Sequence, residues 1–213
     1  MQARLHRDTQ AGQPKPAEDK LIRKLTDEEV RSLARWSPEQ MRTRLVAAAD
    51  RKWSSDALLD GRLPGCGSAL APVIGHGMTQ DRMQVAPITD SHGFSMEWLR
   101  LEPGQAVSAF RLPQKQVLIA QHGGAEIVLN RGPQAVTLPI GALDTFSVPE
   151  GVWRSIRNPG NAAVELIVVT SGDDRKRPEF APETVQAARD AGVALDASGY
   201  LAPASWLPGR RAA

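Results

Sequence analysis

Four side chains near the middle of the chain have types and a spacing that could hold a small molecule. Phe110, Leu112, Gln114 and Gln116 are each two residues apart, and residues with this spacing point to the same side of an extended strand. They would form an apolar wall that ends in amides. Phenyl and isobutyl groups cannot ligate a metal ion, and an amide offers one weak neutral oxygen. Pro113 can add a bulge that shifts this alternation.

A cation follows in a second β-prone segment, residues 153–157. The guanidinium of Arg154 is charged at every relevant pH, and burying it without a partner is strongly unfavourable. If buried, it would pair with a carboxylate of the protein, such as Asp144 or Glu97. Otherwise it would hold the carboxylate or phosphate of a ligand through bidentate hydrogen bonds. Outward exposure of Arg154 is the third alternative.

The residues around these positions have the spacing of a known family. They are Gly104, Phe110, Leu112, Gln116 and Gly123, followed by Pro149, Gly151, Arg154 and Asn158. This pattern resembles the two motifs of the cupin superfamily, G-x5-H-x-H-x3-4-E-x6-G and G-x5-P-x-G-x2-H-x3-N. Leu143-Asp144 replaces the opening Gly-Asp of the second motif, with a glycine at Gly141. The resemblance covers residues 81–172, and it implies a mainly β fold, a double-stranded β-helix or jelly-roll barrel.

The resemblance also implies that four residues occupy the family's metal-ligand positions inside the barrel. These residues are Phe110, Leu112, Gln116 and Arg154, and none is an ordinary metal ligand, since arginine even repels a cation. The usual metal site is therefore expected to be absent, and no metal or other cofactor is expected. Cupins include dioxygenases, decarboxylases, isomerases, epimerases, sugar-sensing regulators and storage proteins, so the resemblance alone assigns no activity.

The first functional hypothesis is a small-molecule-binding protein with a sensing or accessory metabolic role. Arg154 and Gln116 would hold an anionic or polar metabolite, with Phe110, Leu112 and Gln114 lining the site. One alternative is a dioxygenase-like or isomerase-like enzyme with a relocated metal site, formed by His76 and His92 with Asp90 or Asp144. A second is metal-free acid–base chemistry such as epimerisation, which needs a buried base of suitable pKa. A packed barrel with a purely structural role in a dimer is a third.

Composition narrows the class of protein. The chain has 213 residues, a formal net charge of +2 and one cysteine, which excludes an internal disulfide framework and a cysteine-based zinc cluster. The arginines are spread along the chain, so nucleic acid is not an expected partner. No apolar run is long enough for a membrane span, and residues 1–20 lack the apolar core of a secretory signal. We therefore expect a cytoplasmic protein.

Four regions are expected along the chain: a disordered tail at 1–20, a helical arm and irregular connector at 21–80, the barrel at 81–172, and a C-terminal helix and tail at 173–213. Thr26 with Glu29, and Ser37 with Gln40, have the spacing of capping boxes. They predict one helix up to Trp36 and a second up to about Trp53. Pro182 and Gly192 predict a short helix from 182 to 191.

Eight or nine short strands are expected between residues 84 and 170, because β-prone runs there are separated by glycine and proline. The first is expected at Gln84–Ile88, and residues 60–80 are expected to be irregular. Because cupins pair through sheet faces and exchanged termini, the resemblance implies a homodimer. Residues 21–55 or 195–213 would contact the other subunit.

Overall fold

The computed structural model describes residues 24–33 and 35–207 of the chain. They belong to two units, one up to residue 40 and the other from residue 41 onward, and each is described by itself. The tail expected at residues 1–20 lies outside the described residues.

Two short helices begin where the sequence predicts. Helix α1 spans Asp27–Leu33 and α2 spans Pro38–Arg42. In each capping box the side chain and the backbone exchange hydrogen bonds. In the first box, the Glu29 backbone N donates to Thr26 Oγ1 at 3.2 Å, and the Thr26 backbone N donates to the Glu29 carboxylate at 2.8 Å. In the second, the Gln40 backbone N donates to Ser37 Oγ at 3.2 Å, and the Ser37 backbone N donates to Gln40 Oε1 at 2.8 Å. These bonds satisfy amides that have no partner within the helix itself.

The second helix is much shorter than its sequence predicts. It ends at Arg42, and the segment that follows contains only a 3-10 turn, η1 (Ala48–Asp50). Val46 and Trp53 instead pack against Trp98 on the outer side of a sheet, and the guanidinium of Arg51 lies 3.6 Å from the centre of the Trp98 ring. The prediction of a helix up to Trp53 was therefore wrong, because packing of these side chains outweighs a weak helical pattern.

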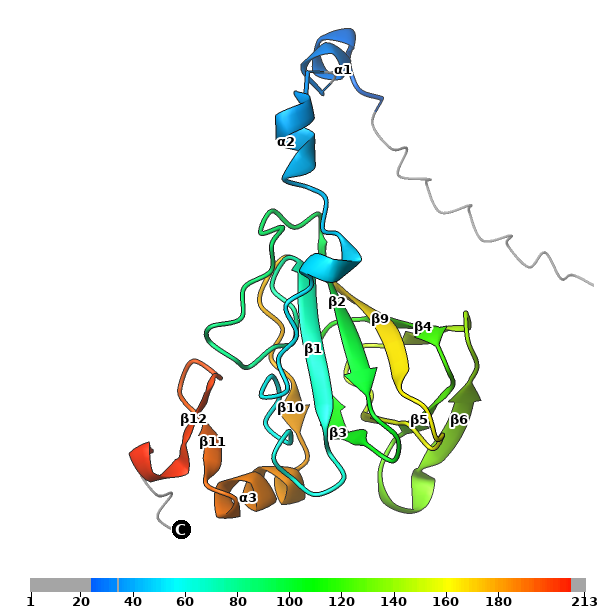
Figure 1. The fold of residues 1–213 in the computed structure, drawn as a ribbon, viewed down its shortest axis with the longest axis vertical. Coiled ribbons are helices and arrows are strands. Elements are labelled where there is room, and N and C mark those ends of the chain that lie inside the picture. The colour runs from blue at the N-terminus through cyan, green and yellow to red at the C-terminus, as the bar shows by residue number, and fades with distance from the viewer. Residues whose placement is uncertain (1–23, 34, 208–213) are drawn as a thin grey trace, which may run out of the picture. The chain divides into compact units, whose positions relative to one another are not determined.

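The barrel consists of two five-stranded antiparallel sheets (Figure 1). The first has the order β1 (Ser68–Ile74), β2 (Phe94–Leu101), β9 (Val164–Ser171), β4 (Gln116–His122), β7 (Thr145–Val148). The second has the order β10 (Glu179–Phe180), β3 (Ala106–Arg111), β8 (Arg154–Arg157), β5 (Ala125–Leu129), β6 (Val136–Ile140). Between β2 and β9 the chain passes from one sheet to the other at every connection except the β5–β6 hairpin, as in a jelly roll, which confirms the expected fold class.

The core lies between the two sheets and follows the period of two that strands impose. In β9, Val164, Leu166, Val168 and Thr170 are buried, while the residues between them are half-buried on the outer side. The three motif glycines, Gly104, Gly123 and Gly151, each have a φ of 73°. Only glycine adopts this conformation at no steric cost, so their spacing marks three turns of the barrel.

Two expectations about the first strands were wrong. Residues 68–74 were expected in the irregular connector, but they form β1 and pair with β2. Residues 84–88 were expected to form a strand, yet Ile88 makes only an isolated bridge with Ile74. The continuous sheet edge of β2 offers β1 a full row of backbone partners, which outweighs the many prolines and glycines of the connector.

The C-terminal region continues the second sheet. After β10 comes α3 (Pro182–Asp190), which stops before Gly192 as predicted. Strands β11 (Val193–Leu195) and β12 (Leu201–Pro203) then form a hairpin that ends in a 3-10 turn, η3 (Ala204–Trp206) (Figure 1). No helix in the described part of the chain is long and apolar enough to cross a membrane.

Candidate functional site

The barrel places the motif residues in its interior. Phe110 on β3 and Arg154 on β8 are direct partners in the register of the two strands. Gln116 is the first residue of β4, and Leu112 lies in the turn that connects β3 to β4. All four side chains are buried, with exposed fractions of 0–1%. They come from three separate places in the chain and meet because the two sheets face each other.

Arg154 is held by an amide, a backbone carbonyl and an aromatic ring. Its Nε and Nη2 atoms donate to Gln116 Oε1 at 3.3 and 3.1 Å, and Nη1 donates to the Val152 carbonyl at 3.0 Å. The guanidinium carbon lies 4.5 Å from the centre of the Phe110 ring, a distance suited to a cation–π interaction.

Of the three alternatives for Arg154, the ion pair with Asp144 or Glu97 was wrong, and so was outward exposure, since the side chain is fully buried. Asp144 accepts a hydrogen bond from the Gly141 backbone N at 2.7 Å, within its own turn. Glu97 is bound by the backbone N of Met78. Within the described part of the chain, Arg154 makes no salt bridge. Burial lowers the pKa of Arg154 to about 10, because desolvation disfavours the charged form, yet the group stays protonated at neutral pH.

Gln116 links Arg154 to the rest of the interior. Its Nε2 donates to Thr170 Oγ1 at 3.1 Å and to the sulfur of Met78 at 3.2 Å. Thr170 on β9 is the register partner of both Gln116 and Ser95. Ser95 is 1% exposed, and its hydroxyl oxygen has no hydrogen-bond partner among the described residues. A buried hydroxyl without a partner is uncommon and indicates a place for a water or ligand atom.

Two further ionisable groups, which the sequence analysis did not select as site residues, are buried near these side chains. Glu97 on β2 is 1% exposed, and both of its oxygens accept from the Met78 backbone N, at 3.0 and 3.1 Å. Lys176 is fully buried, and its Nζ donates to the carbonyls of Gly172 and Asp174, each at 2.6 Å. Burial raises the pKa of Glu97 to about 7, although the Met78 amide and the charge of Lys176 act in the opposite direction.

The β2 sequence contains a signal that would have found Glu97. Ser95, Glu97, Leu99 and Leu101 alternate with Met96, Trp98 and Arg100, and the first set is buried between the sheets. Polar residues on a strand face that is otherwise apolar indicate a functional or structural polar site. We call these buried polar side chains the polar cluster: Ser95, Glu97, Gln116, Arg154, Thr170 and Lys176.

The remaining predicted residues lie outside the polar cluster. Gln114 is half-buried in the turn before β4, and its Oε1 is buried without a partner among the described residues. Strand β3 ends at Arg111, so the alternation does not extend to Gln114. His92 contacts the guanidinium of Arg44, and His76 is exposed. The described residues contain no group of three or more His, Cys, Asp or Glu placed to hold a metal ion.

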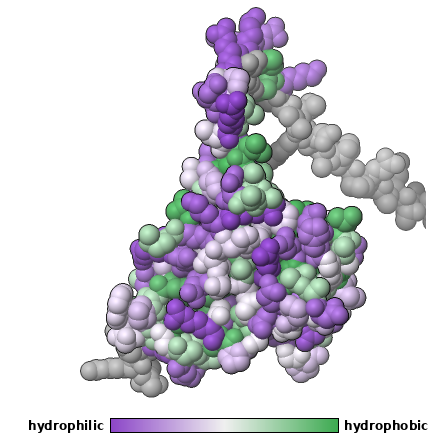
Figure 2. All heavy atoms as spheres, viewed as in Figure 1, coloured by the Kyte–Doolittle hydropathy of each residue, from purple (hydrophilic) through white to green (hydrophobic). Residues whose placement is uncertain are grey.

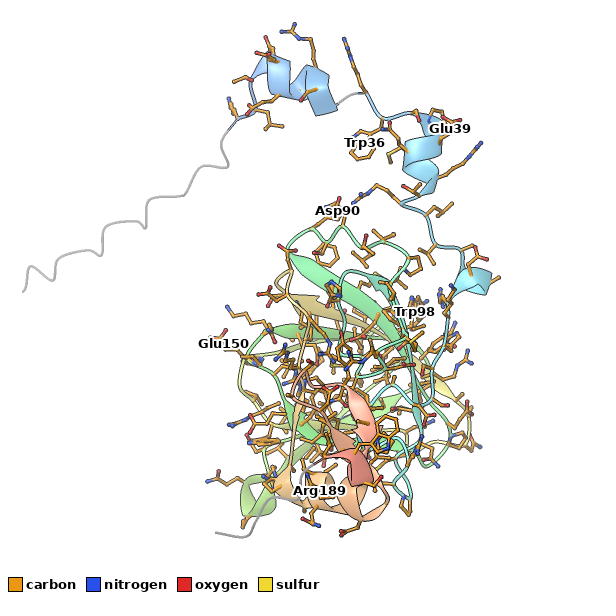
Figure 3. All side chains as sticks on the ribbon, turned by 90° about the vertical axis from the view of Figure 1, so that its left-hand side faces the viewer. Trp36, Glu39, Asp90, Trp98, Glu150 and Arg189 are labelled. Carbon is orange, nitrogen blue, oxygen red and sulfur yellow. The ribbon has the colours of Figure 1, made fainter. Side chains whose placement is uncertain are left out.

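Figure 3 shows side chains throughout the barrel. The space next to Phe110 is bordered by Leu58, Met78, Val107, Phe110, Pro178 and Phe180, and it has no room for a water molecule. A ligand of Arg154 could therefore extend into this space only if one of these side chains moved.

No protein-family model matches the chain, and no curated protein does. Among solved structures, the chain is similar to an oxalate oxidase, with 19% sequence identity over 58% of this chain and 59% of that one, and a TM-score of 0.46. The chain thus spans about three fifths of the length of that protein.

Two bacterial cupin proteins are also similar in structure. A cupin 2 domain-containing protein from Halorhodospira halophila has 19% identity over 57% of this chain and 75% of that one, with a TM-score of 0.44. A cupin-2 domain protein from Rhodospirillum rubrum has 12% identity over 69% of this chain and 86% of that one, with a TM-score of 0.49. The strand order of the chain is that of a jelly roll, and the solved structures to which it is similar include cupin-domain proteins.

Proposed function

We propose that the protein binds a small anion, carrying a carboxylate or a phosphate, at Arg154 and Gln116 inside the barrel. The observation that carries this proposal is a fully buried arginine whose partners in the described structure are all neutral. A buried cation without a countercharge is costly, and an anionic ligand would supply that countercharge. Binding would suit a sensing or accessory role in metabolism.

The donors around Arg154 support an anion rather than a neutral ligand. A guanidinium has five N–H donors, and three of them are used in the hydrogen bonds to Gln116 and Val152. The remaining donors, with the Gln116 amide and the hydroxyls of Ser95 and Thr170, match the several acceptors of a carboxylate or phosphate. Phe110 and Leu112 would contact the apolar part of such a ligand.

Replacement of Arg154 by alanine is expected to weaken binding of such an anion by ten- to a hundred-fold, because a charge-assisted hydrogen bond contributes about 1.5–3 kcal/mol. A thermal-shift screen of carboxylates and phosphates would identify a ligand, and titration calorimetry would compare the variants. Arg157→Ala is the matched control, since Arg157 is on the same strand but pairs with Glu126 at the surface. A screen that yields only neutral ligands, or equal binding by Arg154→Ala, would show that Arg154 has only a structural role.

Metal-free acid–base chemistry is the second candidate, and one observation favours it. The motif positions supply no base, but Glu97 is a carboxyl group inside the barrel with a pKa raised to about 7 by burial. A group with this pKa can accept and donate protons near neutral pH. If the ligand identified by the screen is converted to a product, and Glu97→Gln binds it without converting it, this second function applies.

Purified protein without a histidine tag is expected to contain less than one equivalent of Fe, Mn, Ni, Zn or Cu per chain. The motif positions hold Phe110, Leu112, Gln116 and Arg154, whose side chains are poor metal ligands. Elemental analysis by plasma mass spectrometry would measure the content. One tightly bound metal per chain that is lost on mutation of His76 or His92 would instead support a relocated metal site and a metal-dependent enzyme.

We further propose that the protein is a homodimer in which residues 24–55 contact the other subunit. Leu25 just before α1, Val30 on α1 and Met41 on α2 are each about half exposed, and a partner subunit would cover them. On the face drawn in Figure 2, hydrophobic residues are mixed with hydrophilic ones. Light scattering is expected to give the mass of a dimer for the full chain and the mass of a monomer after deletion of residues 1–40. A monomeric full chain at micromolar concentration would contradict the proposal.

A further inference from the structure

The segment that follows β1 covers the polar cluster. Residues 75–80, called the strap below, leave the sheet at Gly75, which has a φ of 63° and donates its backbone N to the Ile88 carbonyl at 2.7 Å. Gly77 lies directly against the buried carboxylate, because a Cβ atom at this position would be 2.2 Å from Glu97 Oε2. The strap belongs to the connector that was expected to be irregular, and it has no role in the proposed function.

Met78, at the centre of the strap, reaches into the barrel at two points. Its backbone N donates to both oxygens of Glu97. Its sulfur accepts from Gln116 Nε2 at 3.2 Å, and Gln116 is the residue that holds Arg154. Met78 is 1% exposed and belongs to the main hydrophobic core. A thioether is a weak acceptor. An anionic oxygen in place of the sulfur would therefore form a stronger hydrogen bond with Gln116 Nε2.

Both ends of the strap are fastened, while the Met78 side chain is intrinsically flexible. Gln80 donates its backbone N to the Ala57 carbonyl and accepts from Leu201 N, and Arg175 Nη2 donates to the Thr79 carbonyl at 3.3 Å. Methionine has three rotatable side-chain bonds and no branch. Outside the strap lies a cavity of about 30 Å³ beside Arg175 and Tyr200. A change in the Met78 side chain therefore needs less rearrangement than opening of the whole strap.

We propose that Met78 is a built-in plug of the barrel, and that a ligand reaches Arg154 by displacing the Met78 side chain from Gln116. The size of residue 78 then determines how large a molecule the site admits. This inference rests on the proposed function in one respect only, which is that the molecule that displaces Met78 is an anion. The plug itself is a property of the strap and is testable without any ligand.

Chemical modification of arginine by phenylglyoxal, followed by peptide mass spectrometry, measures access to Arg154. In the wild type we expect Arg154 to react at least ten times more slowly than Arg62, whose side chain is 61% exposed. In Met78→Ala the Arg154 rate is expected to rise at least ten-fold with Arg62 unchanged. Met78→Leu, which keeps the volume, is expected to protect Arg154 as the wild type does.

Two controls separate the plug from a general loss of stability. Met83→Ala makes the same substitution at a methionine that is 85% exposed, and Leu166→Ala opens the core at a buried position on β9. Neither is expected to expose Arg154. If Met78→Ala does not fold by circular dichroism, Met78→Val replaces it. An unchanged Arg154 rate in the folded variant, or an equal acceleration in Leu166→Ala, overturns the plug.

The same variant distinguishes the plug from the anion site. Inorganic phosphate and acetate are the probes, and a bound anion is expected to slow the modification of Arg154 in Met78→Ala by at least five-fold at saturation. If Arg154 becomes reactive but neither anion protects it, the plug stands and the proposed anion binding fails for these two anions.

Discussion

Replacement of Asn158 by alanine is expected to lower the free energy of unfolding by about 3 kcal/mol. Asn158 is 1% exposed, and its Nδ2 donates to the carbonyl of Leu101 at 3.0 Å and to that of Ala162 at 2.8 Å. Its Oδ1 accepts from Gly160 N at 3.0 Å. The amide thus ties the turn between β8 and β9 to the end of β2. Without it, carbonyl groups in a buried environment lose their donors.

Chemical denaturation with urea would measure this change. Asn161→Ala is the matched control in the same turn, since Asn161 is exposed, and a surface substitution usually changes stability by less than about 0.5 kcal/mol. Equal stabilities of Asn158→Ala and Asn161→Ala would show that the second-motif asparagine does not hold the turn in solution.

A fall in pH from 8 to 5 is expected to increase the free energy of unfolding, by up to about 3 kcal/mol from one buried carboxyl group, Glu97, and by about half as much from a second, Asp60. Burial raises the pKa of Glu97 from 4.5 to about 7 and that of Asp60 from 3.8 to about 6. The folded state therefore binds protons that the unfolded state releases in this range. Each group destabilises the fold above its folded pKa, and this cost disappears as the pH falls towards its unfolded pKa.

The local structure around Asp60 explains its raised pKa. Asp60 is fully buried, and while Oδ2 accepts from Ser108 N at 2.5 Å, Oδ1 has no partner among the described residues. Below about pH 4 the trend reverses, because four carboxylates at or near the surface have pKa values lowered by hydrogen bonds and lose their stabilising effect when they are protonated. This set contains Asp173, Glu179, Glu183 and Asp196.

Urea denaturation at pH 5 and pH 8 checks this prediction. Glu97→Gln is expected to remove the contribution of Glu97, and Asp60→Asn that of Asp60, so that each variant has a smaller difference between the two pH values. Glu102→Gln is the control, since Glu102 is exposed. A protein that is more stable at pH 8 than at pH 5 would show that these carboxyl groups are hydrated or paired in solution.

The sequence determined the barrel by itself, for a physical reason that is local. Glycine at positive φ marks the turns at Gly104, Gly123 and Gly151, and the alternation within β9 marks its buried side. Strand side chains and turn backbones obey rules that need only near neighbours. The capping boxes are local too, and the predicted starts of α1 and α2 were confirmed. The predicted length of α2 was wrong, because it depended on how the residues after the helix pack against Trp98.

The tertiary structure alone decided what surrounds Arg154. Spacing placed Phe110, Gln116 and Arg154 in the interior, but it could not say that the partner of Arg154 would be an amide instead of Asp144 or Glu97. Such pairings depend on the register between strands far apart in the chain. Met78 comes from a connector with no periodic pattern, and it enters the barrel because β1 pairs along β2 and directs the chain back over Glu97. Only the assembled sheets bring Met78, Glu97 and Gln116 into contact.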